Sequence, residues 1–357
     1  ILNNVAATNG GGVYSVNSAA EQTNTLLMIG GDITGNTAGN FGGGVYVYTG
    51  TTFSLENGTI QDNIAAGAGG GGIYLYISAT FFMLSGLVQG NIAATRGGGL
   101  YVGNSAEANM SAGSITGNAS AEVGGGVYVY MDGSFTMTGG EIASNTANES
   151  GGGMYIQPGG TATMENIAMG GNGGMVNIGD TTFGPVTNGG GIYLTADGSL
   201  SILGVSYIVG NTAPLGMGGG IFTEDLTYEN LLTGTGTVFE NNTADGVQRP
   251  PEVTPLNIGF AFTSVLSSPL NNYDINSSTG EIISFTVFYE PNGGTDSFAQ
   301  SGLSYGALYT ILSAEEAGIS RPGFTFGGWN TEPDGSGMSY APGEQILITG
   351  NLVLYAQ

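Results

Sequence analysis

The sequence predicts a mainly β protein in which a long parallel β-helix solenoid precedes a smaller β module. Three observations support this prediction. An asparagine recurs about every 27 residues, a Gly-Gly-Gly-aliphatic-aromatic stretch follows it each time, and a different pattern begins at Phe285. A fixed repeat of this length, made of short β-type runs separated by glycine, is typical of solenoids, whose repeats pack against their nearest neighbours.

The recurring asparagines define the repeat unit. Stacked coils place equal positions about 4.8 Å apart, so an asparagine at a bend can bind the backbone and the asparagine of the next coil. We therefore interpret the column as a structural ladder. One unit, the sixth, carries an insertion after its asparagine. The members of the column are Asn36, Asn63, Asn91, Asn118, Asn145, Asn172, Asn211 and Asn242, with Asn4 before them.

Apolar residues mark the strands of each unit. They occupy alternate positions before the asparagine, as in Phe53 and Leu55, and again after the glycines, as in Val45 and Val47. Because strand side chains alternate between two faces, such pairs predict strands whose apolar side faces the interior of the coil. The pattern predicts three short strands and three bends per coil. The triple glycine lies at a bend whose backbone conformations other residues do not readily adopt.

The aromatic residue after the glycines forms a second column, which we expect to point outward. The rings either cover the bare glycines and stack on one another, or form a platform for sugars. The sequence leaves both interpretations open. The column comprises Tyr46, Tyr74, Tyr101, Tyr128, Tyr155 and Tyr193, with Tyr14 before and Phe222 after them.

The composition excludes several functions. The chain has no Cys, His or Lys, and its three cations, Arg96, Arg249 and Arg321, stand against 27 acidic residues, for a net charge of −24. This charge repels nucleic acid and anionic lipid, so neither is an expected partner. No apolar run is long enough to predict a membrane span, and we expect no metal or cofactor site. Low total charge with abundant Gly, Thr, Ser and Asn suits a secreted surface protein.

The repeat units resemble a known family. The stretches Ile33-Thr-Gly-Asn-Thr-Ala with Gly42-Gly-Gly-Val-Tyr-Val-Tyr, and Ile142-Ala-Ser-Asn-Thr-Ala with Gly151-Gly-Gly-Met-Tyr-Ile, carry the resemblance. They are similar to the right-handed β-helix repeats of adhesin-like surface proteins and to polymorphic outer-membrane protein repeats. The resemblance implies a right-handed parallel β-helix, export, and adhesion or surface display, without fixed catalytic residues.

Residues 245–284 depart from the repeat. Gln248-Arg-Pro-Pro-Glu-Val-Thr-Pro cannot continue a strand ladder, because proline lacks the backbone donor and fixes φ. Strand character returns at Ile258-Gly-Phe-Ala-Phe. We expect residues 258–284 to form a closing coil and cap, since an open solenoid end leaves an unpaired edge. The first domain is therefore predicted to comprise residues 1–284.

Residues 285–357 form the second predicted domain. An alternating strand at Phe285-Thr-Val-Phe-Tyr leads into the turn Asn292-Gly-Gly, and Arg321-Pro-Gly-Phe-Thr-Phe-Gly-Gly-Trp-Asn, Asp334-Gly-Ser-Gly and Leu354-Tyr-Ala follow in order. These motifs closely resemble the Listeria-Bacteroides repeat, the internalin-type B repeat. The resemblance implies a small β-grasp-like module of extracellular proteins, and Trp329 is expected in its core.

An enzyme is the alternative, because many β-helices cleave polysaccharides. A pair of carboxylates could hydrolyse a neutral glycan. Two of the available acidic residues precede glycine, as turn residues commonly do, so the pattern favours a protein without catalytic residues. The acidic residues in or near the coils are Asp132, Asp180, Asp197, Glu224 and Asp225.

The preferred function is that of an extracellular, non-enzymatic structural or adhesive protein: an adhesin, a stalk or a self-assembling fibre subunit. The alternative is a β-helix that binds or degrades a neutral polysaccharide. The expected partners are a host or cell-surface glycan or protein, or other copies bound head to tail, because the chain begins within a coil. The insertion, with Met175, Asn177, Asp180 and Phe183, is the first candidate for a lateral binding loop.

Overall fold

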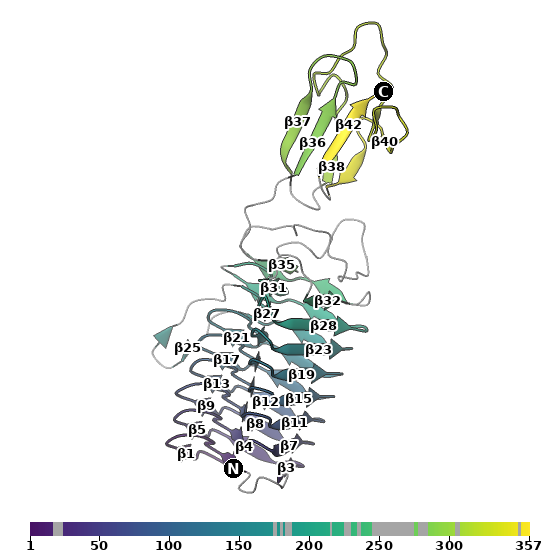
Figure 1. The fold of residues 1–357 in the computed structure, drawn as a ribbon. Coiled ribbons are helices and arrows are strands. Elements are labelled where there is room, and N and C mark those ends of the chain that lie inside the picture. Colours follow the sequence, from purple (N-terminus) through teal and green to yellow (C-terminus); the bar gives the residue numbers. More distant parts are fainter. Residues whose placement is uncertain are drawn as a thin grey trace. The chain divides into compact units, whose positions relative to one another are not determined.

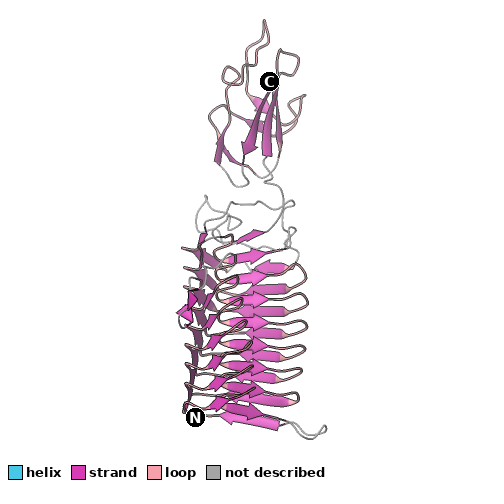
Figure 2. Cartoon of the chain, turned by 90° about the vertical axis from the view of Figure 1, so that its left-hand side faces the viewer, coloured by secondary structure: helices cyan, strands magenta, loops and turns pink. Residues whose placement is uncertain are grey.

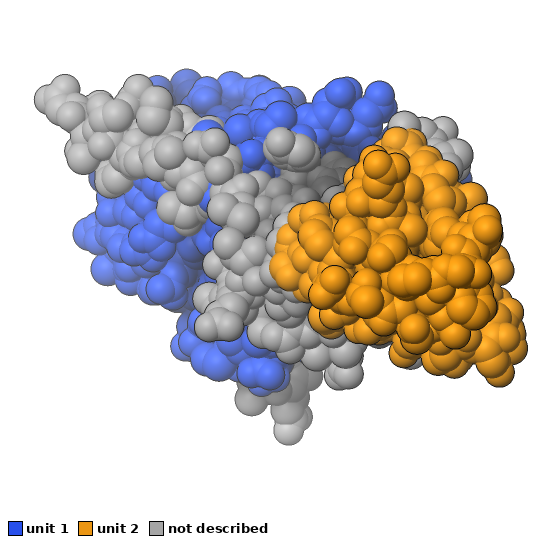
Figure 3. Space-filling model, turned by 90° about the horizontal axis from the view of Figure 1, so that it is seen from above, with its two compact units in different colours: residues 1–279 blue, residues 280–357 orange. Residues whose placement is uncertain are grey.

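The computed structural model describes residues 1–16, 24–173, 177–178, 181–182, 188–214, 216–224, 230–233, 237–244, 275–277, 285–303, 308–348 and 351–357. Within these residues every regular element is a strand (Figure 1). The chain divides into two compact units, residues 1–279 and 280–357, which Figure 3 shows in blue and orange. The mainly β fold is therefore confirmed.

Residues 1–279 contain the predicted parallel β-helix. Its coils stack on one another, and the strands of the coils pair in parallel with the equivalent strands of the neighbouring coils (Figure 2). The register keeps equal positions together, as in Ile73 opposite Val45 on one side and Leu100 on the other. The strands of the regular coils fall into four stacks, one strand from each coil in each stack.

The first stack, named here the tyrosine sheet, carries the aromatic column and consists of β2 (Val13–Ser15), β6 (Val45–Val47), β10 (Ile73–Leu75), β14 (Leu100–Val102), β18 (Val127–Val129), β22 (Met154–Ile156), β27 (Ile192–Leu194), β31 (Ile221–Thr223) and β35 (Ile275–Ser277). The second consists of β3 (Asn24–Met28), β7 (Thr51–Leu55), β11 (Thr80–Met83), β15 (Glu107–Met110), β19 (Ser134–Met137), β23 (Thr161–Glu165), β28 (Ser199–Leu203) and β32 (Leu231–Thr233).

The third stack consists of β4 (Asp32–Thr34), β8 (Thr59–Gln61), β12 (Leu87–Gln89), β16 (Ser114–Thr116), β20 (Glu141–Ala143), β24 (Ala168–Gly170), β29 (Tyr207–Val209) and β33 (Val238–Glu240). The fourth consists of β1 (Val5–Ala6), β5 (Thr37–Ala38), β9 (Ile64–Ala65), β13 (Ile92–Ala93), β17 (Ala119–Ser120) and β21 (Thr146–Ala147), and later of the pair β30 (Thr212–Ala213) and β34 (Thr243–Ala244).

The expectation of three strands per coil was wrong, because the asparagine bend divides one strand in two. The residue immediately before each asparagine has a positive φ, between 53° and 65°. This left-handed conformation turns the chain through a corner, so the strands before and after the bend enter different stacks. Glycine, asparagine and aspartate tolerate it best and hold most of these positions. The residues concerned are Asn3, Gly35, Asp62, Gly90, Gly117, Ser144, Gly171, Gly210 and Asn241.

The core of the solenoid is a set of apolar columns inside the coils. One position from each stack illustrates it: Val45, Phe53, Ile60 and Ala65 are all fully buried. Strand alternation places these side chains inward and their polar neighbours outward. Since the same chemistry recurs in each coil, every column is continuous along the stack.

The insertion of the sixth unit lies between two described points of the coil. Gly173 bridges to Thr212 in the next coil, and Asn188 bridges to Ser150 and Met217. The two short strands β25 (Asn177–Ile178) and β26 (Thr181–Thr182) pair antiparallel with each other and join none of the four stacks (Figure 1).

Parts of the predicted loop and cap fall outside the described residues. Among the predicted loop residues, Met175, Asp180 and Phe183 lie there. So does most of the expected closing coil and cap at 258–284. In that region the structure describes β35, which pairs in parallel with β31 and so extends the tyrosine sheet.

The second unit is a small mixed sheet. Its strand order is β37 (Phe298–Leu303), β36 (Phe285–Glu290), β42 (Leu352–Ala356), β39 (Trp329–Asn330) and β40 (Ser339–Tyr340), with β36 and β42 parallel, and β38 (Leu308–Thr310) pairs separately with β41 (Gln345–Leu347). Trp329 is buried in the core against Tyr289 and Phe326, and its Nε1 donates to the carbonyl of Leu312 at 2.7 Å.

Candidate functional site

The predicted asparagines form one continuous ladder inside the coils. The backbone N–H and the Nδ2 of Asn63 both donate to Oδ1 of Asn91, at 3.0 and 2.9 Å. The second Nδ2 hydrogen of Asn63 donates to the carbonyl of Ile33, one coil back, at 2.9 Å. The same pattern continues from Asn36 to Asn211, and all eight side chains are at most 5% exposed. These amides are occupied within the fold and present nothing to a ligand.

The predicted aromatic column is also continuous. The rings from Tyr14 to Phe222 follow one another with centroids 4.4 to 5.6 Å apart. Five of them, Tyr46, Tyr74, Tyr101, Tyr128 and Phe222, are at most 8% exposed. Each ring alternates along its strand with core residues, as Tyr46 does with Val45 and Val47, and each ring face lies against the next ring. Of the two interpretations, the geometry favours stacking over a sugar platform formed by these ring faces.

A second row of tyrosines covers the first, and sequence reasoning missed it. We name Tyr48, Tyr76 and Tyr130 the tyrosine patch. They are half-buried, and Tyr48 and Tyr76 stack at 5.2 Å. Each lies beside the inner column, as Tyr130 does at 6.1 Å from Tyr101. The sequence signal was the recurring Tyr-x-Tyr after the glycines, which places two rings on the same side of one strand.

The row is interrupted at one coil by Gly103. An added Cβ at this glycine would lie 2.4 Å from the carbonyl oxygen of Leu75, so the close approach of two coils excludes a side chain there. The patch therefore contains the tyrosines that directly follow β6, β10 and β18, and none follows β14.

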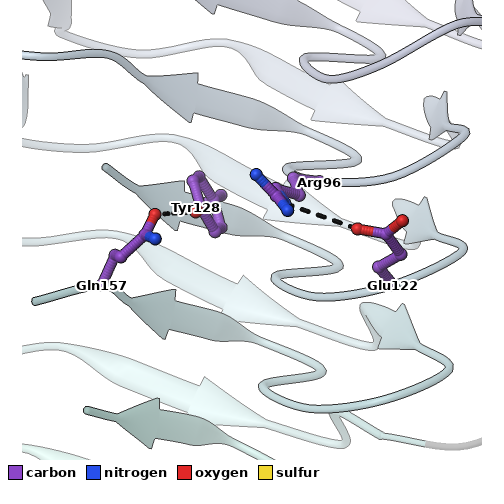
Figure 4. Close-up of polar contacts among 4 residues, drawn as sticks. All are labelled: Arg96, Glu122, Tyr128 and Gln157. Carbon is purple, nitrogen blue, oxygen red and sulfur yellow. Dashed lines mark hydrogen bonds and ion pairs between the residues drawn. The ribbon is translucent and has the colours of Figure 1, made fainter. Parts of the chain in front are cut away.

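One ion pair lies beside the inner column (Figure 4). Arg96 Nε is 3.4 Å from Glu122 Oε2, and the guanidinium lies 5.7 Å from the ring centroid of Tyr128. On the other side of this ring in Figure 4, the Tyr128 hydroxyl donates to Gln157 Oε1. Both charged side chains are more than one-third exposed, so the pair contributes little to stability. Its polar groups belong to the rim of the aromatic cluster.

Burial keeps the inner phenols neutral. It raises the pKa of Tyr155 to about 12, with the Glu224 carboxylate as a second cause. It raises the pKa of Tyr74, Tyr101 and Tyr128 still further. A phenol with so high a pKa does not serve as a base near neutral pH. The column is therefore a packing element, and its hydroxyls from Tyr46 to Tyr193 stay protonated.

The acidic candidates occupy structural positions where the structure describes them. Asp132 is a turn residue with φ of 55°. The Asp197 carbonyl accepts a hydrogen bond at 2.9 Å from the N–H of Gly159, which lies in a turn of the preceding coil. Glu224 accepts from the Tyr193 hydroxyl at 2.6 Å and from a backbone N–H at 3.2 Å. Asp180 and Asp225 lie outside the described residues.

Among the described residues, no group of three or more His, Cys, Asp or Glu residues could hold a metal ion. Among the same residues, no helix has the length and apolar character needed to cross a membrane.

Comparison with known families identifies both units. The family described as right handed beta helix region matches residues 43–249, and the Listeria-Bacteroides repeat domain matches residues 285–357. These matches confirm both resemblances predicted from the motifs. Among curated proteins and among solved structures, nothing matches the chain. The combination of these two domains is typical of surface or extracellular proteins.

Proposed function

Because the chain belongs to the right-handed β-helix family and carries a Listeria-Bacteroides repeat, we propose that it is a non-enzymatic adhesive protein of the cell surface. The coils serve as a rigid scaffold, and one lateral face binds a host or cell-surface glycan or protein. The tyrosine patch on the tyrosine sheet is the proposed contact surface.

The observation that supports this proposal is the contrast between the two rows of tyrosines. The inner rings are buried and stacked, whereas Tyr48, Tyr76 and Tyr130 are partly exposed above them. Tyrosine offers a large apolar ring with a polar hydroxyl, and its few torsion angles limit the entropy lost on binding. A buried second layer holds such rings in place before a partner arrives, which lowers the cost of ordering them.

The structural roles of the described acidic residues support the proposal that the protein is not an enzyme. Glu224 is held by a phenol and a backbone N–H, and Asp132 and Asp197 lie in turns. A glycosidase needs two carboxyl groups facing one sugar bond, one of them protonated. New reducing ends in neutral glycans incubated with the chain, and their loss in Glu224→Gln, would instead support the alternative enzyme.

A binding experiment tests the adhesive function. The full chain and the variant Tyr48→Ser/Tyr76→Ser/Tyr130→Ser are compared for binding to a glycan array and to host cells. Phe82→Ser on β11 is the matched control, since Phe82 is 38% exposed on another sheet. Loss of binding in the triple variant alone supports the patch. Equal binding by all three proteins removes it.

The insertion and self-association remain separate predictions. Deleting residues 174–184 should spare the coils, because Gly173 and Asn188 already pair with neighbouring coils. If this deletion abolishes binding while the triple tyrosine variant does not, the loop is the contact surface.

Sedimentation of the purified chain over a range of concentrations tests head-to-tail association, and a monomer throughout would exclude it.

A further inference from the structure

A tight turn in the second unit places an arginine beside an exposed aromatic ring. In Arg321-Pro-Gly-Phe324, the Phe324 N–H donates to the Arg321 carbonyl at 3.1 Å, and Gly323 has φ of 82°. Proline at the second position and glycine with positive φ at the third are the residues that a type II turn requires. The turn brings its first and last side chains together, so the guanidinium carbon of Arg321 lies 3.9 Å from the ring centroid of Phe324.

This pair lines a cavity of about 460 Å³. The volume lies within the range of small-molecule sites in proteins. Phe326 and Ile319 supply apolar wall, and Asn292, Thr325 and Gln357 add amide and hydroxyl groups. Phe324 is 67% exposed and so is not part of the buried core around Trp329. An exposed ring held by a turn at the edge of a cavity is available for a ligand.

The charge of Arg321 points to the kind of ligand. It is the single Lys or Arg in residues 285–357, where seven acidic residues occur. Within the described part of this unit the guanidinium forms no ion pair, and its Nη1 donates to the Asn292 carbonyl at 3.2 Å. A guanidinium has five N–H donors in a planar fork that matches a carboxylate. The cation is therefore placed where an external carboxylate can reach it.

We propose that this cavity binds a sugar carrying one carboxylate, such as a hexuronate residue. The apolar face of the pyranose ring packs on Phe324, the carboxylate pairs with Arg321, and the ring hydroxyls meet the amide and hydroxyl groups of the wall. A sugar fits this lining better than a peptide terminus does, because the wall offers polar side chains beside the apolar surface. The site is separate from the tyrosine patch and does not depend on the proposed function.

The net charge of −24 limits the ligand further. A densely charged polyuronate is repelled by the chain as a whole. A single carboxylate loses little binding free energy to this repulsion, since charges beyond about 8 Å are largely screened at physiological salt. The cavity should therefore prefer an isolated uronate within an otherwise neutral glycan over a polyuronate.

Calorimetric or saturation-transfer titration of the full chain tests the proposal with two probes, methyl glucuronoside and its methyl ester. The carboxylate probe should bind at least tenfold more tightly than the ester. Arg321→Gln should remove this preference, and Phe324→Ser should weaken both probes. Arg96→Gln, which removes a cation from the solenoid instead, should leave both affinities unchanged.

Three outcomes would overturn the proposal. They are binding of neither probe, equal affinity for acid and ester, and loss of binding in Arg96→Gln. Near-ultraviolet circular dichroism of the buried Trp329 checks that each variant keeps the fold of the second unit. Binding that survives in the triple tyrosine variant separates this site from the proposed adhesive surface.

Discussion

Replacing one ladder asparagine by alanine should destabilise the solenoid far more than a surface asparagine does. Asn118 is fully buried in the middle of the column. Its Nδ2 donates to the Val88 carbonyl at 2.9 Å and to Asn145 Oδ1 at 3.0 Å. Its Oδ1 accepts from the backbone N–H and the Nδ2 of Asn91, at 3.0 and 2.9 Å. Asn118→Ala removes all four hydrogen bonds.

Three buried groups then lose a partner: the Val88 carbonyl, the Asn91 backbone N–H and one Asn91 Nδ2 hydrogen. The oxygen of Asn145 keeps its bond from the Asn118 backbone at 2.9 Å. An unsatisfied buried polar group costs about 1–3 kcal/mol, so the sum is about 3–9 kcal/mol before any water enters the space. We expect about 4 kcal/mol, a large part of the stability of a typical domain.

Hydrogen exchange of peptides from the coils around Asn118, together with urea unfolding, measures the loss. Local exchange is needed because repeat arrays do not always unfold in one step. Asn109→Ala is the matched control, since Asn109 lies half-exposed on the outward side of β15 in the same unit. If the two variants differ by less than about 1 kcal/mol, the ladder is not the stabilising element described here.

The isosteric variant Asn118→Asp separates hydrogen bonding from volume. It keeps an acceptor for Asn91 but places an oxygen opposite the Val88 carbonyl and Asn145 Oδ1. Burial and these oxygens raise the pKa of the new carboxyl above its unfolded value of about 3.9. The protonated acid can donate a bond, so this variant should be most stable below about pH 4 and lose stability as the pH rises through its folded pKa. A variant whose stability relative to the parent chain does not change with pH would refute this reasoning.

Three other predictions follow from the described contacts. Burial raises the pKa of Tyr155 to about 12. The stabilisation from the buried neutral phenols should therefore be fully present below about pH 10 and be lost as the pH rises through their folded pKa values. A spectrophotometric titration in which all tyrosines ionise near pH 10 before unfolding would contradict this. Gly125→Ala places a Cβ 2.1 Å from a backbone oxygen and should lower the free energy of unfolding by about 1–3 kcal/mol. In the control Gly30→Ala the added Cβ meets nothing within 4 Å, so thermal unfolding should change little. Equal effects of the two variants would argue against the close contact between coils. Trp329→Phe leaves the Leu312 carbonyl without its donor and should destabilise the second unit by about 2 kcal/mol, while exchange in the solenoid stays unchanged; faster exchange in both units would show that they unfold together.

Features that depend on local periodicity could be predicted from the sequence. The repeat of Asn63 and Asn91, the alternating apolar pairs and the motif around Trp329 each depend on neighbours along the chain or on the same position one coil away. A solenoid multiplies such signals, because each coil repeats the same physical requirement. For this reason the fold class, both families and the in-register stacking could be expected before the structure was known.

Features that depend on backbone angles or on distant cover were harder to predict. The corner before each asparagine is held by glycine, aspartate, serine or asparagine, which share a tolerated φ and no single identity. The burial of the inner tyrosines depends on Phe41, Val123 and the tyrosine patch, which come from other positions of the repeat. The cavity at Arg321 depends on where a turn lies against strand ends, and composition shows no trace of it.

The ladder also determines how such a protein can change in length over evolution. Each asparagine donates to the asparagine of the following coil and accepts from that of the preceding one, and partners are 27 or 28 residues apart in the regular part. A duplicated unit of that size would therefore find both neighbours ready, and a deleted unit would leave its neighbours able to bond with each other. Gene duplication can therefore lengthen the solenoid in equal steps of about 4.8 Å, the spacing between neighbouring strands. Extra sequence of any other length must leave the coil between two paired points, as it does between Gly173 and Asn188.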